Sequence, residues 1–178
     1  MLRSILNQIE IITTEIKEVN TRIENQVREK FSKERDLLKT IPGVDEKTSQ
    51  TIIAELGANM KVFPSENHAS SWAGTCPKRN KSAENIKNSK NEGNKHLKSA
   101  LNQSSWSTIK CKDSFLKGKY YYLAGKIGAK RALCAIANKL LKSAYQVLSS
   151  GKEYIEKGYN HSENNKINLT TEFLNISN

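Results

Sequence analysis

The chain has 178 residues, enough for one hydrophobic core with an appendage but hardly for two independent domains. Its 29 Lys and Arg outnumber 18 Asp and Glu, and a formal net charge of +11 favours a polyanionic partner. No apolar run approaches the ~20 residues needed to span a bilayer, and the N-terminus lacks the apolar centre of a signal peptide. These properties exclude a membrane-spanning protein and predict a cytoplasmic one. They favour nucleic acid over a membrane surface as the partner.

The first segment has apolar residues that alternate at steps of three and four. They are Leu2, Ile5, Ile9, Ile12, Ile16, Val19 and Ile23. This spacing is typical of a coiled-coil seam of about three heptads, so we predict a coiled-coil helix over residues 1–36. A single helix cannot bury such a seam by itself. Either a second copy pairs with it through residues 2–27, giving a homo-oligomer, or the helix packs against its own domain.

Residues 37–57, LLKTIPGVDEKTSQTIIAELG, predict two helices joined by a tight turn. Asp45 or Thr48 can cap the second helix, and Gly57 ends it. The arrangement resembles a helix-hairpin-helix motif, in which a glycine lets backbone N–H groups approach a DNA phosphate, so Gly43 is a candidate DNA contact. Asp45 stands where the motif usually has a second glycine. A plain helical turn is the alternative interpretation.

Helical character continues beyond this hairpin. Phe63 and Trp72 indicate a core-building stretch with a short helix, and a longer helix begins at Lys95. After a turn near Lys117 and Gly118, the pattern continues as helix to about residue 150. In the last helix the predicted packed face consists of Ala132, Ile136, Leu140 and Tyr145. The fold class is therefore all-α.

Between these helices, residues 77–94 read PKRNKSAENIKNSKNEGN and predict a long basic loop. Residues 78–142 hold sixteen Lys and Arg against three acids, which predicts salt-dependent binding of nucleic acid without distinguishing DNA from RNA. The candidate nucleic-acid contacts are Lys78, Arg79, Asn80, Lys81, Lys87, Lys90, Gly93, Asn94, Lys95, Lys130 and Arg131. Beyond the helices, residues 155–178 have the composition of a flexible tail.

Three blocks, residues 37–57, 72–101 and 119–154, resemble the C-terminal transposase domain of the IS110 family of insertion sequences. The second block, WAGTCPKRNKSAENIKNSKNEGNKHLKSAL, is similar to the family's succession of Trp-x-Gly, Cys-Pro, Asn-x-Ser-Ala and Lys-x-Gly-Asn. In that family the serine of the Asn-x-Ser-Ala element is the nucleophile that cleaves DNA and forms a phosphoserine link. The resemblance implies this catalytic role for Ser82.

Members of the family join a RuvC-like nuclease domain, a coiled coil and the serine-bearing domain, and a structured bridge RNA directs them to DNA. The resemblance therefore implies DNA and a structured guide RNA as partners. The four metal-binding acids of the nuclease domain are not among these residues. We expect no cofactor or metal site in this chain, Mg²⁺ only together with the nuclease domain, and no transposition by this chain unaided.

Three functions follow from these patterns. The first is a DNA-binding part of a transposase that supplies Ser82 for strand cleavage and exchange, with a helical domain over residues 37–154. The second is a non-catalytic remnant that binds nucleic acid and dimerises through its coiled coil. The third is an RNA-binding or nucleoid-type structural protein in which Ser82 has no role.

Overall fold

A computed structural model of the chain describes residues 1–76, 93–112 and 114–156. Within these residues the fold is built from helices and contains no strand, which confirms the predicted all-α class. The helices are α1 (Leu2–Lys30), α2 (Ser32–Lys39), α3 (Glu46–Leu56), the short 3₁₀ helix η1 (Met60–Val62), α4 (Glu66–Trp72), α5 (Lys95–Thr108), α6 (Phe115–Ile127) and α7 (Ala129–Ser150).

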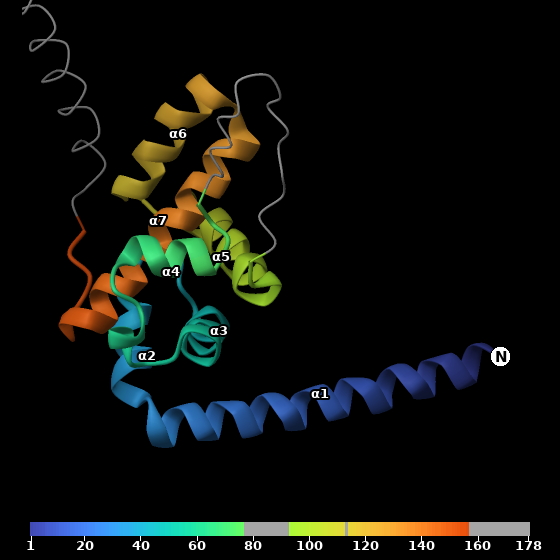
Figure 1. Cartoon of the computed structure of the whole chain (residues 1–178). Helices are drawn as coiled ribbons and strands as arrows, with labels where there is room; N and C mark the ends of the chain where they lie inside the picture. Colours follow the sequence, from blue (N-terminus) through green and yellow to red (C-terminus); the bar gives the residue numbers. More distant parts are fainter. Residues whose placement is uncertain (77–92, 113, 157–178) are drawn as a thin grey trace, which may run out of the picture.

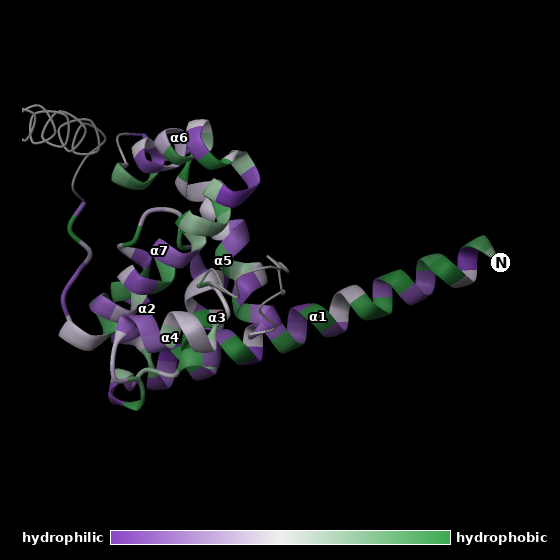
Figure 2. Ribbon diagram, turned by 45° about the horizontal axis from the view of Figure 1, so that its top comes forward, coloured by the Kyte–Doolittle hydropathy of each residue, from purple (hydrophilic) through white to green (hydrophobic). Residues whose placement is uncertain are grey.

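Helix α1 extends away from the other helices as a single long rod (Figure 1). Its apolar seam is exposed over its whole length; Ile9 and Ile16, for example, keep 53% and 54% of their surface. Apolar and polar segments alternate along the rod in Figure 2. Only near its end does α1 join the body, where Val27 is buried and Phe31 packs against the core. Of the two predicted arrangements, packing of the seam against its own domain is therefore wrong within the described residues.

Helix α7 is the centre of the core and contacts α2, α4, α5 and α6. Three of the four residues predicted for its packed face are completely buried. These are Ala132, Ile136 and Leu140. The fourth, Tyr145, is partly buried, and its hydroxyl donates to the carbonyl oxygen of Phe63 at 2.9 Å. Burying this apolar face is the main stabilising contribution of the helix.

Two predictions about this part of the chain are wrong. Lys117 and Gly118 do not form a turn, because α6 runs through both and Gly118 is buried. The chain instead turns before Ser114, which caps α6, and again at Gly128, which has a φ of +85° that favours glycine. Trp72 is not a core residue, because 46% of its surface is exposed and its ring only meets the edge of Phe63.

The chain after α7 folds back onto the body. The N–H of Tyr154 donates to the Thr40 hydroxyl at 2.9 Å, and the Glu156 carboxylate accepts from the N–H of Phe115 at 2.9 Å. Defined contacts thus reach Glu156, the second residue of the predicted tail, whereas 157–178 lie outside the described residues. Over the described residues no helix is long and apolar enough to cross a membrane. In the same residues no three His, Cys, Asp or Glu side chains converge to hold a metal ion.

Candidate nucleic-acid interface

The turn between α2 and α3 is clamped onto α5. Gly43 has a φ of +83°, and a β-carbon placed on it would lie 2.8 Å from the Cα of Thr108. Ser104 donates its hydroxyl to the carbonyl of Gly43 at 2.6 Å, and Thr108 donates to the carbonyl of Pro42 at 2.8 Å. Glycine is needed here because of its backbone conformation and because another backbone passes close by. The open side of Gly43 is thus used for packing against α5.

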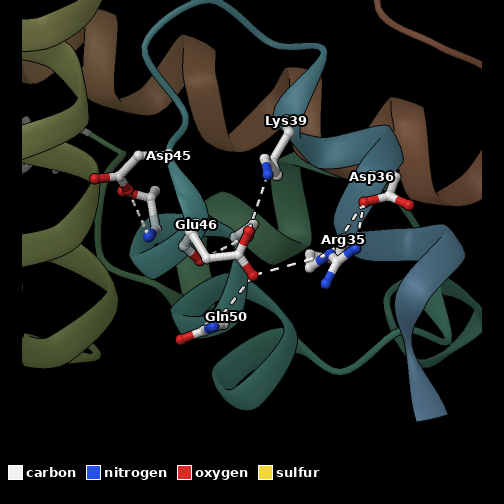
Figure 3. Close-up of polar contacts among 8 residues, drawn as sticks. Arg35, Asp36, Lys39, Asp45, Glu46 and Gln50 are labelled. Atoms are coloured by element: carbon white, nitrogen blue, oxygen red, sulfur yellow. Dashed lines mark hydrogen bonds and ion pairs between the residues drawn. The ribbon is translucent and has the colours of Figure 1, made fainter. Parts of the chain in front are cut away.

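On the side of the hairpin facing α2, the charged groups are already paired (Figure 3). The Glu46 carboxylate accepts from Lys39 Nζ at 2.9 Å and lies 3.8 Å from Arg35 Nε. Arg35 Nη2 also lies 2.7 Å from Asp36 Oδ1, and the side-chain amide of Gln50 donates to the Glu46 carboxylate. The hydrogen bond from Lys39 is the main reason that the pKa of Glu46 is lowered. These two cations therefore stabilise the hairpin and carry little unbalanced charge for a ligand.

Asp45, which directly precedes Glu46, caps α3 and lies on the side of the hairpin that faces α5 (Figure 3). Its carboxylate accepts from the N–H of Thr48 at 2.8 Å, as the sequence predicted. Hydrogen bonding from Thr48, first through its side chain, lowers the pKa of Asp45. A carboxylate therefore occupies the N-terminus of α3, where an anion would otherwise find free N–H groups.

The segment predicted to carry the reacting serine is bounded by two glycines in contact. A β-carbon on Gly74 would lie 2.8 Å from the Cα of Gly93, and both residues have positive φ. Asn94 then caps α5 by accepting from the N–H of Leu97 at 2.9 Å, and its amide donates to Glu55 on α3. Both ends of the segment are thus held at one place, beside α3 and the start of α5.

Helices α6 and α7 carry many cations and contain no acidic residue. Three lysines lie on α6, and three lysines and one arginine lie on α7. Lys130 and Arg131 are exposed at the start of α7. Lys119 Nζ lies 5.7 Å from the centre of the Phe115 ring, and burial together with the nearby charge of Lys139 lowers its pKa. Such like charges repel each other and would be stabilised by phosphate.

Residues 35–121 match the model of the Transposase IS116/IS110/IS902 family. This segment is a transposase domain of that family. The match runs from α2 into α6 and includes the hairpin, both glycines and the segment between them. No curated protein matches the chain. This match confirms the resemblance to the IS110 family that the sequence motifs indicated.

The predicted site residues fall on different parts of this transposase domain and the helix that follows it. Gly93, Asn94 and Lys95 lie together where α5 begins, whereas Gly43 lies at the other end of α5, beside Thr108. Lys130 and Arg131 form a third position, on α7. The remaining candidates lie outside the described residues. They are Lys78, Arg79, Asn80, Lys81, Ser82, Lys87 and Lys90.

One feature of the transposase domain was missed in the sequence. A groove of about 380 Å³ lies between the first turns of α3 and one face of α5. Nine of its eleven lining residues have polar side chains. The lining consists of Gly43, Asp45, Lys47, Thr48, Thr51, His96, Ser99, Ala100, Gln103, Ser104 and Ser107. On α5 the positions 96, 99, 103 and 107 are three or four apart, so helical spacing alone would have placed them on one face.

Proposed function

We propose that this chain is the DNA-binding part of an insertion-sequence transposase and that Ser82 is its nucleophile in DNA strand cleavage and exchange. The family match, which spans Ser82, is the observation that carries the proposal. The contact between Gly74 and Gly93 supports it, because both ends of the Ser82 segment are held beside a body rich in cations.

In this reaction the Ser82 oxygen forms a bond to phosphorus while the bond from phosphorus to one deoxyribose oxygen breaks. The proton released by the serine balances the proton taken up by the departing sugar hydroxyl. A phosphoserine ester preserves the energy of the broken phosphodiester, so a second sugar hydroxyl can reverse the step and exchange strands. The lysines and arginine that neighbour Ser82 in the sequence, Lys78, Arg79, Lys81 and Lys87, would stabilise the negative charge that develops on the phosphate.

Within this proposed function, we assign the binding of DNA phosphates to α6 and α7. Lys130 and Arg131 are exposed, carry no ion pair within the described chain, and belong to helices without a carboxylate. Each phosphate contact adds about one unit to the slope of binding against salt concentration. We propose that these helices hold the DNA backbone, and that a structured guide RNA is a second partner of the same surface.

Helix α1 supports a second copy of the chain as a further partner. Its seam of isoleucines is exposed and has no cover from the described part of the body. The spacing of three and four is that of a coiled coil, in which two such seams bury each other. The same helix favours the alternative function, a non-catalytic remnant that dimerises and binds nucleic acid.

Covalent capture of DNA tests the proposal. The chain is incubated with labelled nicked and intact duplexes of random sequence and run on a denaturing gel, and any adduct is mapped by mass spectrometry. A phosphodeoxynucleotide on Ser82, lost in Ser82→Ala and retained in the control Ser89→Ala, supports the nucleophile. Salt-dependent binding with no adduct, both for the chain alone and after addition of Mg²⁺ and a RuvC-like nuclease domain of the family, overturns the catalytic role and supports the remnant. Absence of binding to DNA overturns both.

A further inference from the structure

We propose that the groove between α3 and α5 is a separate contact for nucleic acid, which receives the sugar-phosphate backbone of a DNA strand. This inference rests on the proposed DNA-binding function and adds a place and a chemistry to it. Nothing in the sequence pattern singled out this groove, because its donors come from two helices about fifty residues apart.

Several donors in the groove are not used by the fold. Three hydroxyls of the lining already have partners. Thr48 bonds to the Asp45 carboxylate, Thr51 donates to the carbonyl oxygen of Lys47, and Ser104 donates to the carbonyl oxygen of Gly43. Four other lining side chains, which end in an amine, a hydroxyl or an amide, make no hydrogen bond or ion pair with the described part of the chain. These are Lys47, Ser99, Gln103 and Ser107. A phosphate accepts hydrogen bonds from all three chemical types.

The arrangement of these donors fits a chain rather than a small ion. His96, Ser99, Gln103 and Ser107 follow one another along α5. At 1.5 Å per residue this row is about 16 Å long, which is enough to reach more than one phosphate of a strand. Trp106 lies on the same side of the helix as Ser99 and Gln103 and leaves 53% of its surface exposed. An exposed indole beside a row of donors can stack on a base or sugar.

The charges and polarity of the lining exclude other ligand classes. Asp45 is the only carboxylate among the lining residues, and Lys47 balances its charge, while the row of donors that would meet phosphate lies across the groove on α5. One carboxylate does not hold a divalent cation, which prefers several oxygen ligands. Ala100 is the only lining residue with an apolar side chain, so an apolar ligand would cover polar side chains at every other lining position except Gly43.

This groove and the lysines of α6 and α7 predict different responses to salt. Neutral hydroxyl and amide donors release no counterions, so their removal weakens binding equally at every salt concentration. Removal of a cation lowers both the affinity and the salt slope. The two contacts can therefore be distinguished in one titration series.

The test uses fluorescence anisotropy of the full chain with a labelled duplex of random sequence, the corresponding single strand and a structured RNA hairpin, over a series of salt concentrations. The variant Gln103→Ala/Ser107→Ala removes two free donors. The control Asn102→Ala/Ser149→Ala removes the same two kinds of group, an amide and a hydroxyl, outside the groove. We expect about tenfold weaker DNA binding by the groove variant with an unchanged salt slope, and no change in the control.

Each other outcome is informative. Wild-type binding by the groove variant, when the parent chain binds DNA and Lys130→Gln/Arg131→Gln binds it less, overturns the groove and leaves the proposed function intact. A loss that affects only the RNA hairpin overturns the assignment to DNA. Absence of binding by the parent chain overturns the proposed function first. Circular dichroism and urea unfolding of the groove variant check that its fold is preserved, as expected for exposed side chains.

Discussion

Gly74 and Gly93 lie back to back, with the Cα of Gly93 2.8 Å from the position of a β-carbon on Gly74. Eighteen residues separate the two glycines in sequence, and sixteen of them form the segment from 77 to 92 that carries Ser82. Only two residues without side chains can bring their backbones this close. The contact therefore fixes where the segment begins and ends, independently of what the segment binds.

We expect Gly93→Ala to destabilise the chain by about 2 kcal/mol or more, because the new methyl group meets the backbone of Ala73 and Gly74 and φ is positive. Gly125→Ala is the control: it lies within α6, and a β-carbon there meets nothing within 4 Å. The control should gain about 0.5–1 kcal/mol. Urea unfolding measures both, and equal stabilities for the two variants would contradict the close contact.

Local chemistry explains which parts of the fold the sequence could predict. Asp45 and Gly57 have strong preferences at helix ends, and the structure places them at the two ends of α3 as predicted. Gly118 has no such preference, because a glycine inside a helix costs only about 1 kcal/mol and packing overrides it. Trp72 was predicted wrongly because its burial depends on distant residues, which no local pattern specifies.

The candidate site also combines features that the sequence could predict with features that depend on distant residues. Runs of lysine and the absence of acids are visible in the sequence, and the structure places them on α6 and α7. The contact of Gly74 with Gly93 and the groove between α3 and α5 join residues far apart in the chain. Such pairs depend on how the helices pack, so composition and spacing could name Gly93 and Asn94 but could not reveal that they anchor the segment.

Self-association through α1 is the next prediction. Ile9→Lys/Ile16→Lys places charges on the exposed seam and should convert an oligomer into a monomer, because a paired seam cannot bury four ammonium groups per dimer. Thr14→Lys/Thr21→Lys adds the same charge on the opposite side of the helix and should leave the mass unchanged. Sedimentation equilibrium measures both variants. A monomeric wild-type chain would contradict the pairing directly.

Stability in acid should depend on Asp45. Its pKa is lowered in the folded state, so its contribution is fully present above the ordinary pKa of about 4 and is lost as the pH falls through the lower, folded value. At neutral pH, Asp45→Ala should cost about 1 kcal/mol, and Asp45→Asn, which still accepts a hydrogen bond from Thr48, much less.

Below pH 4 the wild-type chain should lose more stability than Asp45→Asn, since only the carboxylate is titrated. Glu46 titrates in both proteins and does not affect the difference. Urea unfolding over an acid pH series provides the comparison, and parallel curves for the two proteins would rule out the cap as a source of the acid sensitivity.

Alkaline pH should act through Tyr154. Burial, and then the charge of Glu156, raises the pKa of its phenol to about 12, against about 10 in an unfolded chain. A raised pKa means that the neutral phenol is favoured by folding. Its contribution is therefore complete below pH 10 and is lost as the pH rises from about 10 to 12. Tyr154→Phe keeps the ring but has no hydroxyl to ionise, so its stability should fall less across this window.

Tyr121→Phe is the matched control, because 56% of Tyr121 is exposed. Both variants keep every other titratable group, so the difference between wild type and Tyr154→Phe isolates one phenol. Unfolding by urea at several pH values between 9 and 12 provides the measurement. Tyr121→Phe should lose stability at the same rate as wild type. If Tyr154→Phe does so too, the segment after α7 does not hold a neutral phenol against α2. The fold-back through Thr40 is then absent in solution.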